Sequence, residues 1–279
     1  LYGPLFFLMV FSFNSTRQDG VFTGFSMRWY EALFNDSRLV NAFLLSLEVA
    51  VVTGTLSVIL GTLAAFVLVH YTRFRGRPLF SGLVSAPLVM PEVIIGLSLL
   101  LLMVAVQHGI GWPERGIITI VIGHTLLGMA YATIVILARL REMDRSIEEA
   151  AMDLGCRRSQ VFFLVTLPNL VPSLIAAWML TFTLSFDDVV VSEFLSGPGV
   201  TTLPQVIFGY ARRGVNPSIY AAATILILTV SIGIIAYSVL TMRAQAQRER
   251  DAKAAERAEL ASVETGAAGR GAVQLPQGS

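Results

Sequence analysis

Five segments of this 279-residue chain are each apolar over 20 or more residues, and this feature limits the fold more than any other. They cover residues 42–69, 79–106, 117–138, 167–186 and 219–242. A helix needs about 20 apolar residues to cross a hydrocarbon layer roughly 30 Å thick. Lipid offers no partners to backbone N–H and C=O groups, and these runs are too long for barrel strands. The sequence therefore predicts an all-α integral membrane protein.

A shorter apolar stretch, residues 1–13, opens the chain without an initiating Met or preceding basic residues. We interpret it as the outer half of a sixth span, truncated here. A leftover signal-peptide segment is the alternative, disfavoured because no small-residue cleavage site follows. Within residues 79–106, Pro87 and Pro91 are each expected to break or kink the helix, since proline lacks an N–H and clashes with the preceding turn.

The basic residues predict the orientation of the spans. The loops after 42–69 and 117–138, together with the segment after residue 242, contain fourteen of the 20 Lys and Arg residues, and the opposite loops contain six. The richer side is expected to be cytoplasmic, which places both termini inside. The chain then divides into a membrane domain, 1–242, and a charged, disordered cytoplasmic tail, 243–279.

Composition excludes several classes of protein. Only 14% of the residues are charged, against about 25% in soluble domains, which disfavours an ordinary globular enzyme. The single cysteine cannot form an intrachain disulfide, and the three scattered histidines lack the spacing of metal ligands. The sequence contains no H-E-x-x-H motif, so an intramembrane enzyme has little support. The single lysine, Lys253, lies outside any P-loop sequence. Energy for any work must therefore come from a gradient or from another protein.

Residues 139–158 concentrate ten of the 39 charges in a cytoplasmic loop, 139–166, between two spans. A short helix is expected there, capped by Ser146, with Glu149 three residues later and Gly155 as its left-handed end. One helical face is apolar and shallow, so another protein can approach the backbone closely. That face consists of Ile147, Ala150, Ala151 and Leu154. From periodicity alone, a solvated loop helix with no partner is an equal alternative.

The residues of this loop resemble a known signature. Glu149-Ala150-Ala151, then Gly155, then Val165-x-Leu167-Pro168 is similar to the EAA pattern E-A-A-x(3)-G-x(9)-I-x-L-P of bacterial ABC importer membrane subunits, with Val in place of Ile. The resemblance implies a six-span, type I importer-like permease whose loop forms a coupling helix for a cytoplasmic ATPase. The implied coupling residues are Glu149, Ala150, Ala151, Leu154, Gly155, Leu167 and Pro168. A partner ATPase dimer would then bind ATP and Mg²⁺, and this chain would be a translocation subunit without a cofactor or catalysis of its own.

The resemblance extends over residues 1–242 to the spermidine/putrescine permeases, and most of all to their putrescine-transporting subunits. The segments 86–91 (A-P-L-V-M-P) and 182–188 (F-T-L-S-F-D-D) carry it, among others. It implies a second homologous permease subunit, a periplasmic polyamine-binding protein and residence in the bacterial inner membrane, with no nucleic acid partner. The truncated first span and the long tail depart from the family pattern.

Putrescine carries an ammonium at each end, so its path needs carboxylates or aromatic faces. A mid-membrane acid costs about 2.5–3.5 kcal/mol, which makes such a residue a functional candidate by default. Glu48 and Glu92 are the two acids within spans. Glu92 follows Pro91 in an interrupted helix, where broken backbone can line a cavity. Glu48 is near the outer start of its span and can reach the interface instead.

Three more acids, Asp187, Asp188 and Glu193, follow the fifth long segment, and no basic residue lies between Arg158 and Arg212. They are expected to produce a negative field that attracts a dication at the outer mouth. The alternative is that Asp187 and Asp188 merely end a helix in water. The predicted substrate pathway comprises Glu92, Asp187, Asp188, Glu193, Phe186 and Trp178, although the two aromatic residues are equally consistent with core or lipid contacts.

Two other functions stay open from the sequence. The same importer can carry another organic solute, although outer acids disfavour an anion. A gradient-driven secondary transporter is more distant, and Glu48 and Glu92 would then be its proton carriers.

Overall fold

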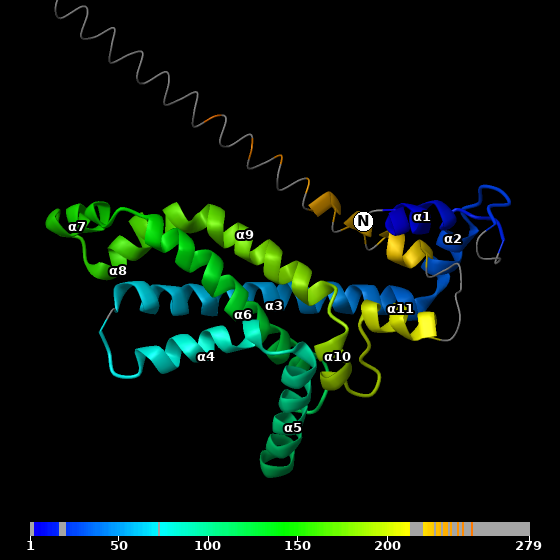
Figure 1. Ribbon diagram of the computed structural model, residues 1–279, viewed down its shortest axis with the longest axis horizontal. Helices are drawn as coiled ribbons and strands as arrows, with labels where there is room; N and C mark the ends of the chain where they lie inside the picture. The colour runs from blue at the N-terminus through cyan, green and yellow to red at the C-terminus, as the bar shows by residue number, and fades with distance from the viewer. Residues whose placement is uncertain are drawn as a thin grey trace, which may run out of the picture. The chain divides into compact units, whose positions relative to one another are not determined.

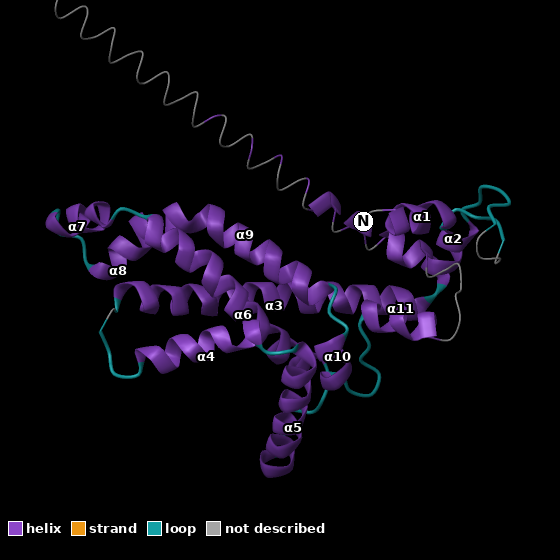
Figure 2. Cartoon of the chain, in the orientation of Figure 1, coloured by secondary structure: helices purple, strands orange, loops and turns teal. Residues whose placement is uncertain are grey.

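The computed structural model describes residues 3–16, 21–71, 73–212, 220–225, 227–229 and 231–233, and residues 235, 239, 242 and 247 singly. The chain divides into two compact units, Leu1–Leu228 and Thr229–Ser279. The elements below belong to the first unit. Within the described residues, all the regular elements are helices (Figure 2). Part of the predicted span 219–242, and nearly all of the tail 243–279, lie outside the described residues.

Four helices of the described part are long and apolar enough to cross a membrane. They are α3 (Ser37–His70), α5 (Glu92–Ile110), α6 (Ile117–Glu142) and the continuous helical stretch Arg158–Phe186, which contains α8, η1 and α9. The shorter helices are α1 (Gly3–Phe11), α2 (Arg28–Asn35), α4 (Arg77–Val89), α7 (Arg145–Asp153), α8 (Arg158–Val161), the π-turn η1 (Phe162–Thr166), α10 (Val190–Leu195) and α11 (Leu203–Arg212), with α9 being Leu167–Phe186.

The centre of the unit is a bundle of α3, α6 and α9, which pack side by side (Figure 1). Their shared core contains small residues such as Ala65, Ala132 and Ala177. Small residues let membrane helices approach closely. The helices approach closely at Gly61, where an added Cβ would lie 2.8 Å from the Cβ of Ala132. This contact requires glycine at position 61.

The break predicted within residues 79–106 is confirmed at Pro91, where the structure divides the segment into α4 and α5. Met90 is extended, with ψ 138°, and Pro91 is the N-cap of α5. A residue before proline avoids the helical region, so the break falls at Met90. Pro87, which was also expected to disturb the helix, lies inside α4 without ending it.

The last long helix begins earlier than expected. The sequence predicted its start at Leu167-Pro168, but the helical stretch begins at Arg158. Pro168 has no N–H to donate to the carbonyl four residues earlier. The chain widens into the π-turn η1 just before it, where the Leu167 amide donates to the Phe162 carbonyl. This wider turn lets the helix continue into the proline.

Short helices cover the opposite end of the bundle from α7. The helix α10 packs between α5 and α6, with Val191 and Leu195 in one apolar cluster with Ile95 and Leu99. The helix α11 lies against α3, where the Leu203 amide donates to Ser46 Oγ at 2.8 Å. The bundle thus carries α7 at one end and the α10–α11 segment towards the other (Figure 1).

Candidate functional site

The ends of α7 are fixed by backbone chemistry. Its N-cap is Asp144, whose carboxylate accepts from the Ser146 amide at 2.9 Å, so the predicted Ser146 cap is wrong by two residues. That backbone hydrogen bond lowers the pKa of Asp144. Gly155 ends the helix with φ +90°, as predicted. The Gly155 amide donates to Met152 O and the Cys156 amide to Ala151 O, the two bonds of a Schellman motif.

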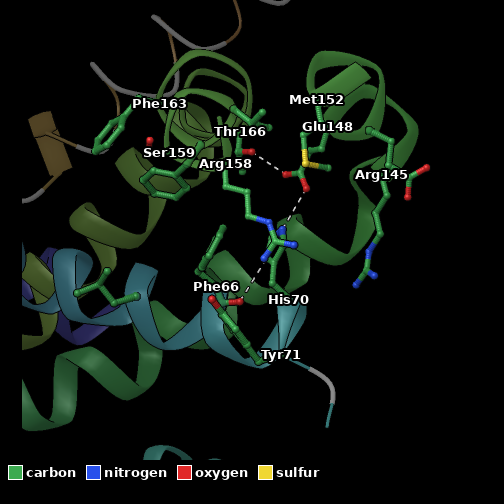
Figure 3. A pocket seen from close by; sticks show the side chains of 14 residues that line it. Phe66, His70, Tyr71, Arg145, Glu148, Met152, Arg158, Ser159, Phe163 and Thr166 are labelled. Carbon is green, nitrogen blue, oxygen red and sulfur yellow. Dashed lines mark hydrogen bonds and ion pairs between the residues drawn. The ribbon is translucent and has the colours of Figure 1, made fainter. Parts of the chain in front are cut away.

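Glu148 attaches α7 to two other helical segments. Its Oε1 accepts a 2.6 Å hydrogen bond from Thr166 in η1, and its Oε2 lies 3.0 Å from Nε2 of His70 at the end of α3 (Figure 3). Burial alone would raise the pKa of Glu148, but the hydrogen bonds from Thr166 and His70 outweigh it and lower the pKa. Arg145 adds a 3.0 Å bond to the carbonyl of Val69.

These contacts lie beside an open pocket of about 490 Å³ between the end of α3, α7 and the α8–η1 segment (Figure 3). Apolar walls come from Phe66 and Phe163, and polar groups come from α7. Neither this pocket nor the contacts of Glu148 were predicted from the sequence, because the apolar face and the EAA pattern, from which the helix was interpreted, do not include Glu148.

The apolar face of α7 is uncovered in this chain. Leu154 is 87% exposed and Ile147 is 51% exposed, and α7 has no buried residue. Glu149 and Ala150 are exposed, whereas Ala151 is half-buried. Exposed apolar patches of this kind mark contact sites for other proteins. The helix is therefore held on its polar side and free on its apolar side.

A second polar group lies where α9 turns into α10. His124 in α6 places Nδ1 2.7 Å from Ser185 Oγ and Nε2 3.1 Å from both Asp188 Oδ2 and Ser192 Oγ. The side chains of His124 and Asp188 are only 2% and 9% exposed. His124 was not among the predicted site residues, although a histidine inside an apolar helix is a signal of an internal polar partner.

The predicted acids do not have equivalent surroundings. Glu92, in the first turn of α5, lines a cavity of about 30 Å³ together with His124 and Asp188, which leaves room for about one water molecule. Asp187 is exposed at the end of α9. Glu193 is exposed and accepts a 3.1 Å hydrogen bond from Gln205. Glu92 and Asp188 are thus brought together, while Glu193 faces α11.

The two predicted aromatic residues belong to one stack along α9. Trp178, Phe182 and Phe186 follow at four-residue spacing, with ring centroids 5.2 and 5.7 Å apart. Trp178 is half-buried and donates to Thr55 Oγ1 at 3.2 Å. Phe186 is only 1% exposed and meets the edge of Phe43. In this structure Phe186 therefore offers no face to a passing cation, contrary to its predicted place on the pathway, because helix packing turns it into the core.

Solved structures with a similar fold define the class of protein. The chain matches a bacterial ABC transporter involved in the import of alginate with a TM-score of 0.69 at 15% identity, covering 87% of this chain and 90% of the other. It matches the MetNI methionine ABC transporter with a TM-score of 0.61 at 18% identity, covering 72% and 94%. At this identity the likeness concerns the fold, which is that of an ABC importer permease.

Sequence relatives define the family. The family model "Binding-protein-dependent transport system inner membrane component" matches residues 57–248. The putrescine transport system permease protein PotI of Escherichia coli is 51% identical over 92% of each chain. The spermidine/putrescine permease protein PotC of Haemophilus influenzae is 36% identical over 87% of this chain and 92% of its own. The chain belongs to the family of binding-protein-dependent transport system inner membrane components, and it is a multi-pass inner-membrane permease.

Proposed function

We propose that this chain is one of two membrane subunits of an ATP-driven importer that moves putrescine, or a related polyamine, into the cell. The observation that carries the proposal is α7, which is uncovered on its apolar face and tied to α3 and η1 through Glu148. The cargo assignment is supported by the 51% identity to PotI and by Glu92, Asp187 and Asp188 at one region of the bundle.

The partners follow from this assignment. A cytoplasmic ATPase dimer binds α7 and hydrolyses ATP with Mg²⁺, since this chain has no P-loop of its own. A second, homologous permease subunit completes the path, and a periplasmic polyamine-binding protein delivers the cargo. Both termini and α7 lie in the cytoplasm, in accord with the excess of basic residues on that side. The chain itself binds no cofactor and no nucleic acid.

Movement passes from α7 into the bundle. When the ATPase displaces α7, the bonds of Glu148 to His70 and Thr166 pull on the end of α3 and on η1, which continues into α9. Because α3 and α9 pack together along the bundle, the displacement reaches the region of the acids. Glu92 and Asp187 there stabilise a desolvated ammonium group.

The decisive experiment is uptake in proteoliposomes that contain the full transporter. Labelled putrescine should accumulate only with ATP and the binding protein, and excess unlabelled putrescine should abolish the signal. An uncoupler should have no effect. Uptake without the ATPase that collapses with an uncoupler would support the secondary transporter instead, and uptake of a different solute would keep the importer but replace its cargo.

A further inference from the structure

The adjacent acids Asp187 and Asp188 have different surroundings, and the difference begins at His124. An ionised carboxylate offers only acceptors, so Nε2 of His124 must carry the proton that points to Asp188 Oδ2 at 3.1 Å. In the neutral ring Nδ1 is then the acceptor, and the Ser185 hydroxyl donates to it at 2.7 Å. Ser192 Oγ lies 3.1 Å from the same Nε2. Both ring nitrogens are thereby satisfied by the corner between α9 and α10.

Asp188 is occupied on its other side as well. Its Oδ2 accepts a 2.8 Å hydrogen bond from the Ser192 amide, and its Oδ1 lies 3.4 Å from the Val191 amide. These amides belong to the first turn of α10, where backbone donors have no partner within the helix. The carboxylate therefore holds the start of α10, and a passing ammonium would have to displace His124 to reach it.

The position of α10 in turn sets the position of α5. Val191 and Leu195 share an apolar cluster with Ile95 and Leu99 of α5. Phe194 lies so close to Gly96 that an added Cβ there would be 2.6 Å from the ring. Glu92 is the first residue of α5, one turn before these contacts. An anchored α10 thus fixes the first turn of α5 and the carboxylate that it carries.

Asp187 lacks such anchoring. It is exposed, and it forms no ion pair with any residue that the structure describes. Glu92 is likewise exposed in the same region, next to the small cavity. The carboxylates of Asp187 and Glu92 are therefore accessible to a cation, whereas that of Asp188 is not.

We propose that His124 is a positioning residue for cargo binding, which acts by holding Asp188 and, through α10, the first turn of α5. Asp188 is then an anchor, and Asp187 with Glu92 form the cation subsite. The inference rests on the proposed function for the nature of the cargo, an organic cation.

Two substitutions of His124 separate the contacts of its ring. The amide nitrogen of His124→Gln reaches about as far as Nε2 and can keep the bond to Asp188, whereas that of His124→Asn reaches only the position of Nδ1. In the reconstituted transporter, His124→Asn should raise the KM for putrescine about tenfold, the effect expected for one lost hydrogen bond to a charged group, with a smaller change in kcat. His124→Gln should stay within about twofold of the unsubstituted transporter. His108→Gln, an exposed histidine at the end of α5, is the matched control and should change nothing.

A second measurement does not depend on cargo. Amide hydrogen exchange in α10 of the purified full-length chain should speed up about tenfold in His124→Asn and Asp188→Asn, but not in His124→Gln or Asp187→Asn. Asp187→Asn should instead raise KM while leaving α10 protected. Equal behaviour of the two His124 variants, or of the two aspartate variants, would overturn the proposal. If the unsubstituted transporter fails to take up putrescine, the proposed cargo is wrong, and the exchange experiment still decides the role of His124.

Discussion

The imidazole Nε2 of His70 lies 3.0 Å from Oε2 of Glu148, a residue 78 positions later in the chain. His70 is the last residue of α3, and Glu148 lies in the middle of α7. The contact therefore connects the helix exposed to a partner with a helix of 34 residues, about 51 Å long at 1.5 Å per residue. Because Glu148 also binds Thr166, one carboxylate links three segments.

Replacing this carboxylate should uncouple ATP hydrolysis from transport. Glu148→Ala removes both hydrogen bonds at a partly exposed site, a loss of about 1 kcal/mol after solvent screening. We expect about fivefold fewer putrescine molecules transported per ATP hydrolysed, with ATPase binding retained. The control is Asp153→Ala, which replaces an exposed acid at the last position of α7. An unchanged ratio in Glu148→Ala would contradict the role given to Glu148.

The attachment of α7 should also depend on pH. The pKa of Glu148 lies below the ordinary value of 4.5 in the folded chain, so its stabilisation is present above about pH 4.5 and is lost as the pH falls through the folded pKa. His70 and Arg145 are the charged or titratable groups that act on it. Amide exchange in α7, corrected for intrinsic rates, should accelerate in that acid range. The Glu148→Gln variant should lack this acceleration, and a similar response in both proteins would refute the assignment.

The exposed apolar face of α7 should contribute to binding the ATPase and not to folding. Leu154→Ser should weaken binding of the purified ATPase at least tenfold, since a buried leucine contributes about 1.5–3 kcal/mol. The thermal stability of the chain itself should change little, because Leu154 is 87% exposed. Val171→Ser, at an exposed apolar position in α9, should leave ATPase binding unchanged. Full-strength binding by Leu154→Ser would show that the face has another use.

Glu92 should affect the affinity for the cation. Glu92→Gln keeps the shape of the side chain and removes its charge, so we expect the KM for putrescine to rise about tenfold, as for a charged partner lost from a partly desolvated site. Glu114→Gln, an exposed acid between α5 and α6, should remain within about twofold. Initial uptake rates measured over a series of putrescine concentrations give the KM of each variant. Equal KM values for the two variants would remove Glu92 from the pathway.

The close approach of α3 to α6 at Gly61 should tolerate no side chain. Gly61→Ala places a methyl group 2.8 Å from Ala132 Cβ and should lower the free energy of unfolding by about 1–3 kcal/mol. Gly82→Ala in α4 meets no atom within 4 Å and should be neutral or stabilising by up to about 1 kcal/mol. Denaturant titration of both variants in detergent measures the difference. The packing of α3 on α6 would need revision if both variants were equally stable.

Local patterns predicted what depends on neighbouring residues in the chain. Long apolar runs predicted helices, and Gly155 predicted the end of α7, because both follow from backbone hydrogen bonding and residue conformation. The cap of α7 was misplaced, since Asp144 and Ser146 are both good capping residues and the pattern alone does not choose between them.

Contacts that depend on how the helices pack could not be predicted from the sequence. His124 meets Asp188 across 64 positions because α6 packs against α9, which Asp188 follows, and periodicity does not predict this packing. Packing also buries Phe186 and leaves Trp178 partly open. The acids could be predicted from their charge alone. The residue that gives Asp188 different surroundings from Asp187 is His124, which shares no sequence motif with them.

The break between α4 and α5 has a consequence for the surroundings of this chain. At Met90 the backbone leaves the helical conformation, so amide and carbonyl groups near it lose their partners in the helix. Hydrocarbon cannot hydrogen-bond such groups, and irregular backbone at membrane depth is tolerated only against protein or water. We therefore expect the side of the chain that carries Met90 and Pro91 to face protein or water and not lipid.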